Sequence, residues 1–151
     1  MMAWLLQPGV DFKTFKLVMD NAVPTKNIFY AIQIKGRFRD IKLRSVPKQH
    51  KPYAPLSAII KKQPLFYSKN IEGTIVGFRC PPFVEGLNVP GYHFHFISKD
   101  TKMGGHVLDF TIEETMLQID YTPKFFMLLP DSEEFYKADQ TINREEELQK
   151  I

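Results

Sequence analysis

Cysteine is almost absent from this sequence, since Cys80 is the only one in 151 residues. A single thiol cannot form a disulfide within the chain, and it cannot supply the cysteine cluster of a structural zinc site. Such usage is typical of proteins that remain in a reducing compartment. We therefore expect a cytoplasmic protein.

Long apolar runs are also lacking. The longest, such as residues 125–130, fall far short of the roughly 20 residues that span a bilayer, and the N-terminus lacks the pattern of a signal peptide. Hydrophobic residues still make up 44% of the chain, enough to bury a core. No repeat, linker or low-complexity segment divides it. We expect a soluble protein without a membrane partner, folded as one domain over residues 1–151.

Acidic residues are scarce in the first part of the chain. Residues 1–62 carry 12 Lys and Arg against 3 Asp and Glu, whereas residues 63–151 carry 8 against 14. This asymmetry can mark a nucleic-acid surface or a pocket for an anionic substrate. It can equally arise from two oppositely charged halves that face each other or water, so charge alone does not assign a function.

Strand-forming residues dominate the middle of the chain. Asp11 can cap an amphipathic helix that ends before Pro24. Strands are expected at 28–34 and 38–45, joined by a tight turn at Gly36, and at 73–79, 91–97, 106–112, 116–121 and 125–129. Short helices are expected at 56–63, 131–137 and 143–149. The pattern predicts an α+β fold, mainly antiparallel or mixed β sheet with a barrel-like curl and a few short peripheral helices.

Histidine is scarce as well, yet three of the four histidines, His93, His95 and His106, lie close together in the sequence. Residues two apart on a strand project to the same face, so His93 and His95 share one face and the neighbouring aromatic residues take the other. The polar residues 98–103 suit a hairpin loop. His106 would then return to within about 4.5–5.5 Å of its cross-strand partner, measured between Cβ atoms.

Three imidazoles that meet at one point are suitable ligands for zinc and for other late divalent metals. Three protein ligands leave a position open for water or substrate, which is typical of a catalytic site. The alternative is a polar strand face that binds nothing. The third histidine, preceded by Gly104 and Gly105 where backbone can pass closely, favours a site for Zn²⁺ or another divalent metal.

Basic residues gather near one predicted strand, at positions 37, 39, 42, 44, 48 and 51. With Phe38 and Tyr53 exposed beside them, they could form a stacking surface for nucleic acid. We expect no nucleic-acid partner, because no RNA-binding signature is present and the sequence pI of about 8.9 is modest. The other interpretation places one arginine beside the metal, where its planar guanidinium can bind a carboxylate. Spacing does not say which arginine.

Several segments of the sequence together carry a family resemblance. The longest, residues 89–110, reads Val-Pro-Gly-Tyr-His-Phe-His-Phe-Ile-Ser-Lys-Asp-Thr-Lys-Met-Gly-Gly-His-Val-Leu-Asp-Phe. The others are Asn-Ile-Phe-Tyr-Ala-Ile at 27–32, Arg-Ser-Val-Pro-Lys-Gln at 44–49, Lys-Pro-Tyr-Ala-Pro-Leu at 51–56 and Val-Gly-Phe-Arg-Cys-Pro-Pro at 76–82. In these segments the chain resembles the bacterial α-acetolactate decarboxylases.

The resemblance implies specific roles. His93, His95 and His106 would be the zinc ligands, and Arg44 would match the family's active-site arginine. The family converts 2-acetolactate, a small 2-hydroxy-3-oxo acid, to (R)-acetoin and carbon dioxide in acetoin and butanediol biosynthesis, with the metal acting as a Lewis acid. Its members are commonly homodimers, so a homodimer is expected here.

The chain also departs from the family pattern. Family members carry a further N-terminal β-rich domain that supplies an active-site glutamate, and a second glutamate near the C-terminus. Neither is assigned here, although Glu145, Glu146 and Glu147 lie in the tail. The alternative function is therefore a catalytically inactive metal-binding fragment or a small-ligand-binding module.

Overall fold

A computed structural model describes residues 2–51, 53, 58–59 and 63–139 of the chain. Within these residues the elements follow the order β1 (Met2–Leu6), α1 (Phe12–Ala22), β2 (Phe29–Arg44), β3 (Leu65–Cys80), the 3-10 turn η1 (Pro82–Val84), β4 (Gly91–Ser98), β5 (Gly104–Thr122) and α3 (Glu133–Lys137). No helix in the described part of the chain is long and apolar enough to cross a membrane.

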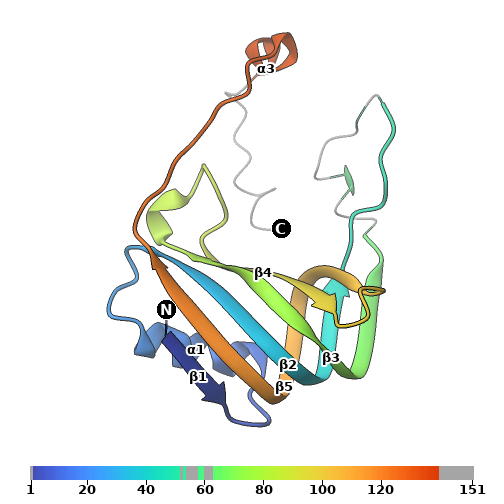
Figure 1. Cartoon of the computed structure of the whole chain (residues 1–151). Coiled ribbons are helices and arrows are strands. Elements are labelled where there is room, and N and C mark those ends of the chain that lie inside the picture. Colours follow the sequence, from blue (N-terminus) through green and yellow to red (C-terminus); the bar gives the residue numbers. More distant parts are fainter. Residues whose placement is uncertain (1, 52, 54–57, 60–62, 140–151) are drawn as a thin grey trace.

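The described strands form one antiparallel sheet in the order β1-β5-β2-β3-β4. The end strand β4 also pairs with β5, but only over residues 95–97 and 104–106. The sheet therefore curls partly back on itself without closing into a clean barrel (Figure 1). This confirms the predicted mainly antiparallel sheet with a few short helices.

The core lies on the inner side of this curl. Alternate residues of the strands are buried there, and α1 packs against them from one side of the sheet (Figure 1). Phe15 of α1 contacts the rings of Tyr92, Phe94 and Phe110, with centroids 6.0, 5.9 and 5.7 Å away. Helix α1 thus fastens β4 to β5 on the inner face, which leaves the outer face of these strands available for a site.

The helix predicted after Asp11 is confirmed. The Asp11 carboxylate accepts a hydrogen bond from the Thr14 backbone N–H at 2.7 Å, which caps the helix, and the helix ends at Ala22 just before Val23. The helix expected at 131–137 is present as α3, capped by Ser132. Of the other two expected helices, 143–149 lies outside the described residues and 56–63 lies largely outside them.

The turn predicted at Gly36 is wrong, because β2 runs unbroken through this position. A Cβ at residue 36 would lie only 2.1 Å from the Glu114 carbonyl oxygen, and the φ of Gly36 is +147°, which favours glycine. The glycine is therefore needed where β2 approaches β5 closely, rather than for a change of direction.

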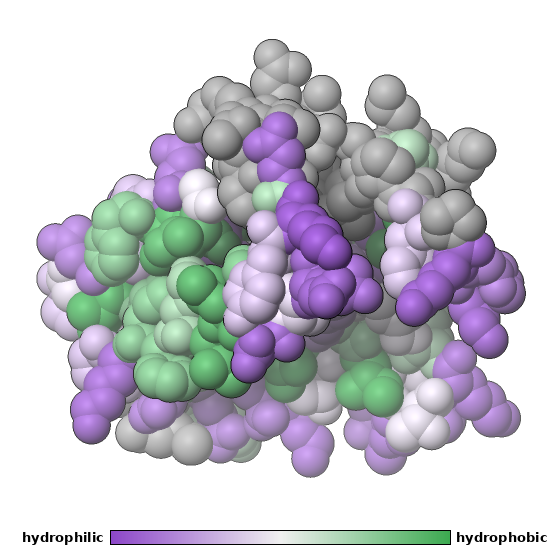
Figure 2. All heavy atoms as spheres, turned by 90° about the horizontal axis from the view of Figure 1, so that it is seen from above, coloured by the Kyte–Doolittle hydropathy of each residue, from purple (hydrophilic) through white to green (hydrophobic). Residues whose placement is uncertain are grey.

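The strand expected at 125–129 is also wrong. Residues 116–121 are the last part of β5, whereas the chain from residue 123 extends from the side of the sheet opposite α1 (Figure 1). Phe126 and Leu128 are 86% and 83% exposed. Seen from that side, apolar residues gather toward the left, where η1 and the start of this extension lie (Figure 2).

Strand β1, which pairs with β5 from Met2↔Ile119 to Leu6↔Thr115, was not predicted from the sequence. Its five residues, Met-Ala-Trp-Leu-Leu, show neither alternation nor flanking turn residues on the N-terminal side. Such a strand is specified by its partner across the sheet rather than by its own sequence.

Candidate metal centre

The three predicted histidines meet on the outer face of the sheet. His93 and His95 alternate along β4 with the buried Phe94, as the period of a strand requires, and His106 of β5 is the register partner of His95. The Nε2 atoms of His93 and His95 lie 3.1 Å apart. One ligand atom from each ring can be chosen so that all three lie within 4.8 Å of one another.

The rings are arranged around a common point rather than stacked in a row. The centroids of His93 and His95 are 5.2 Å apart, those of His93 and His106 are 4.8 Å apart, and those of His95 and His106 are 5.4 Å apart. The planes of His93 and His106 are inclined at 69°, and those of His95 and His106 at 83°. Such an arrangement lets three nitrogens point toward one ion.

The surroundings keep two of the rings neutral. Burial lowers the pKa of His93, and the charges of His95 and Arg44 lower it further. Burial also lowers the pKa of His106, to about 4, with Arg44 and the other two histidines adding to the effect. Neutral imidazole is the form that binds a metal ion, so both rings are in the ligating form at pH 7.

A close approach of two strands holds His106 in place. Gly105, its neighbour on β5, lies against the end of β2, where a Cβ would be 2.6 Å from the Arg44 carbonyl oxygen. Only glycine lets β5 run this near to β2. The close backbone passage predicted at Gly104 and Gly105 is therefore present.

Arg44 lies at the same site. It is the last residue of β2 and the register partner of His106. Its charge contributes to the lowered pKa of both His93 and His106, and its own pKa is lowered by burial. The structure thus places Arg44 beside the histidines, whereas residue spacing did not say which arginine would lie there.

The nucleic-acid interpretation loses one of its two aromatic residues. Phe38 is fully buried in the core, where it contacts Phe96 and Phe110, whereas Tyr53 is 65% exposed. Lys42 lies over the ring of Tyr67, with its nitrogen 5.4 Å from the ring centroid. A stacking surface built on Phe38 is therefore excluded.

A hollow of about 560 Å³ opens beside two of the histidines. Val76 and Phe78 of β3 are the register partners of His95 and His93, so an apolar floor adjoins the imidazoles. Farther across the sheet the lining includes Ala31, Gln33, Gln118 and Asp120. The volume is in the range of small-molecule sites.

The residues of this floor were not singled out in the sequence. Val76 and Phe78 lie on a predicted strand, and their alternation with Gly77 could have placed them on one face. Which other strand lies beside that face depends on pairings between residues far apart in the chain. Among the described residues the ligand group holds three histidines and no carboxylate.

The fold and the site together define a class: a partly curled antiparallel sheet that presents three imidazoles to one point and can hold a metal ion. The family model described as alpha-acetolactate decarboxylase matches residues 4–141. The chain belongs to the alpha-acetolactate decarboxylase family.

Relatives support this membership. The chain is 45% identical over 137 residues to the alpha-acetolactate decarboxylase of Methylococcus capsulatus, covering 91% of this chain and 53% of that protein. It is 42% identical over 146 residues to that of Methanosarcina mazei, covering 97% and 51%. The X-ray structure of alpha-acetolactate decarboxylase from Bacillus subtilis strain 168 superposes with a TM-score of 0.94 at 33% identity, over 99% of this chain and 64% of that one. The chain spans about half the length of the Methylococcus capsulatus and Methanosarcina mazei proteins.

Proposed function

We propose that this chain carries the metal centre of a zinc-dependent decarboxylation of 2-acetolactate to (R)-acetoin and carbon dioxide. His93, His95 and His106 are the metal ligands, and Arg44 binds the substrate. The observation that carries the proposal is the meeting of three imidazoles from two strands with an arginine from a third. Membership of the family supports the choice of substrate.

The donor set fits a divalent metal. With Zn–N bonds of about 2.0–2.1 Å, tetrahedral ligand nitrogens lie about 3.3 Å from one another. The 3.1 Å between the Nε2 atoms of His93 and His95 agrees with this spacing, and the 4.8 Å limit for the whole group leaves a small ring rotation for the third ligand. Three imidazole nitrogens suit zinc, and other late divalent metals also accept them.

The residues suit a hydroxy-keto acid. A bound divalent ion would act as a Lewis acid toward the hydroxyl and ketone oxygens. The guanidinium of Arg44 holds the substrate carboxylate with two parallel hydrogen bonds, a geometry that a lysine cannot provide. The apolar floor made by Val76 and Phe78 takes up the methyl groups and excludes water.

After carbon dioxide leaves, a carbon atom of the remaining molecule must receive a proton on one face to give the product. An acid within hydrogen-bond reach must supply that proton. No carboxylate belongs to the histidine group among the described residues. Within the described residues this favours the second candidate function, a metal-binding or small-ligand-binding module without catalysis. We also propose that the chain forms a homodimer and that it is located in the cytoplasm.

The experiment combines elemental analysis of the purified chain with an assay of acetoin formed from racemic 2-acetolactate. The proposal predicts about one zinc per chain and acetoin formation that stops on chelation. The His93→Ala/His95→Ala variant should lose both, whereas His50→Ala, which removes the exposed fourth histidine, should keep both. Zinc without acetoin would favour the binding module, and a chain that binds no metal would contradict both the decarboxylation and a metal-binding module.

A further inference from the structure

The backbone holds the two histidines of β4 unequally. Strand β4 pairs with β3 along its whole length, from Cys80↔Gly91 to Gly73↔Ser98, but with β5 only at residues 95–97. His95 therefore has backbone partners on both sides, whereas His93 has one on β3 alone. The position of His93 needs a second support.

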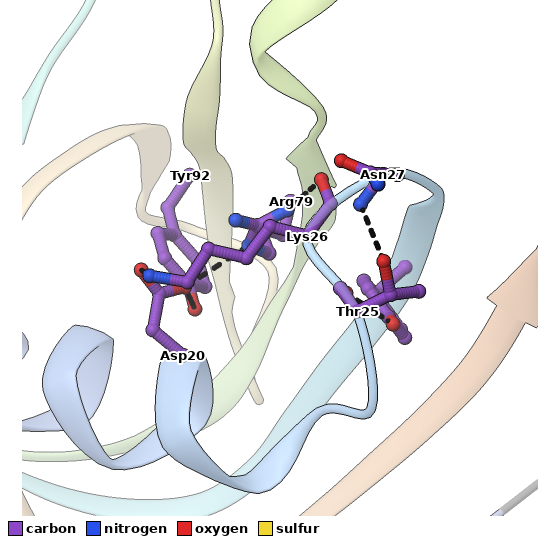
Figure 3. Close-up of polar contacts among 7 residues, drawn as sticks. Asp20, Thr25, Lys26, Asn27, Arg79 and Tyr92 are labelled. Carbon is purple, nitrogen blue, oxygen red and sulfur yellow. Dashed lines mark hydrogen bonds and ion pairs between the residues drawn. The ribbon is translucent and has the colours of Figure 1, made fainter.

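That support lies on the opposite face of the strand, one residue away. The hydroxyl of Tyr92 donates a hydrogen bond to Oδ1 of Asp20 at 2.8 Å, and Nε of Arg79 donates to the same oxygen at 3.0 Å (Figure 3). Nζ of Lys26 lies 3.1 Å from Oδ2 of Asp20. The carboxylate at the end of α1 thus ties β4 and β3 to the helix.

The Arg79 end of this network is shielded from water. The side chain of Arg79 is only 5% exposed, and its second hydrogen bond goes to the Lys26 carbonyl oxygen at 3.0 Å. A buried charge is costly to leave unpaired, so Asp20 is held where Arg79 requires it. Burial and the hydrogen bond to Asp20 raise the pKa of Tyr92, so its hydroxyl keeps its proton and remains a donor.

We infer that Tyr92 and Asp20 form a positioning pair for the metal ligand His93. Successive side chains of a strand project to opposite faces, so anchoring Tyr92 on the inner face fixes the pleat that directs His93 outward. The inference rests on the proposed metal site. It assigns the affinity of that site in part to a hydrogen bond on the far side of the sheet.

The test compares Tyr92→Phe with Tyr30→Phe in the full chain. The first variant removes only the hydroxyl, and its ring can still pack on Phe15 and Phe94. The second removes a buried hydroxyl that donates to the Thr25 carbonyl oxygen at 2.6 Å, on a strand that carries none of the three histidines. The measurements are the Kd for Zn²⁺ by chelator competition, the visible spectrum of the Co²⁺-loaded chain, and the melting temperature.

We expect Tyr92→Phe to weaken Zn²⁺ binding by about 10-fold and to change the Co²⁺ absorption bands, as loss of an outer support of a metal ligand does. Tyr30→Phe should lower the melting temperature without either effect. Zn²⁺ binding and Co²⁺ bands of Tyr92→Phe that match the unmodified chain would overturn this inference alone, and so would equal weakening by both variants. An unmodified chain that binds neither metal would overturn the metal site and this inference with it.

Discussion

At the scale of single residues, the proposed site contains side chains whose chemistry a similar residue would not reproduce. Arg44 of β2 is the register partner of His106 of β5, and its guanidinium offers paired donors that lysine lacks. Gly105 gives β5 room to approach the Arg44 carbonyl. The charge of the arginine alone would not account for the role that we propose for it.

Replacing Arg44 with lysine should therefore keep the metal but impair the reaction. We expect kcat/KM for 2-acetolactate to fall by about 10- to 100-fold, because a charge-assisted hydrogen bond is worth about 1.5–3 kcal/mol. Zinc content should stay unchanged. Arg39→Lys, an exposed position on the same strand, is the control and should retain full activity. Equal losses in both variants would contradict the role given to Arg44.

The sequence could predict those parts of the site that depend on residues close together in the chain. The facing of His93 and His95 follows from strand alternation, and the return of His106 follows from a short loop, so both are local properties. The pairing of Arg44 with His106 joins residues far apart in the chain, and only the resemblance indicated it. The hollow's apolar floor likewise depends on the register between strands.

At the scale of elements, α1 contacts the curled sheet through polar side chains and β2 packs closely against β5. Asp20, near the end of α1, ties β3 and β4 to the helix through Arg79 and Tyr92. Gly36 lets β2 run past β5 without a break. The sequence predicted α1 correctly because capping and apolar spacing are local, but it could not distinguish a close approach from a turn at Gly36.

An alanine at position 36 should destabilise the sheet strongly. Its Cβ would meet the Glu114 carbonyl oxygen at 2.1 Å, and overpacking of this kind costs about 1–3 kcal/mol. Gly9→Ala is the control, because φ is +87° there but an added Cβ meets nothing within 4 Å. Urea unfolding should show a clearly larger loss for Gly36→Ala. A similar loss in both variants would mean that backbone conformation, rather than strand packing, requires the glycine.

The Asp20 network predicts a dependence of stability on pH. Burial by itself raises the pKa of Asp20, but hydrogen bonds from Arg79, Tyr92 and Lys26 outweigh it and hold the pKa below its usual value of 3.8. The ionised carboxylate therefore stabilises the folded chain. This contribution is present above the unfolded-state pKa and is lost as the pH falls through the folded-state pKa.

The variant Asp20→Asn isolates this contribution. At pH 7 it should lower the free energy of unfolding by about 1–3 kcal/mol, because the buried Arg79 loses its charged partner. Urea titrations between pH 7 and pH 3 should then show a smaller acid-dependent loss for the variant than for the unmodified chain. Parallel curves for the two proteins would contradict a stabilising role of the Asp20 charge.

At the scale of the whole molecule, the two faces of the sheet carry different features. The inner face holds α1 and the aromatic core, while the outer face carries the histidines, Arg44 and the hollow. Apolar side chains of residues 125–129 remain exposed on the outer side. The strand prediction failed because the residue types suit a strand, but no neighbouring strand pairs with them within the described fold.

The measurement that tests the central claim most directly is titration of the metal-free chain with Zn²⁺ by calorimetry, together with His106→Ala and His50→Ala. We expect one saturable site per chain, lost in His106→Ala and unchanged in His50→Ala, because the proposed ligands are the three clustered histidines. Absence of saturable binding, or equal binding by the unmodified chain and His106→Ala, would contradict it.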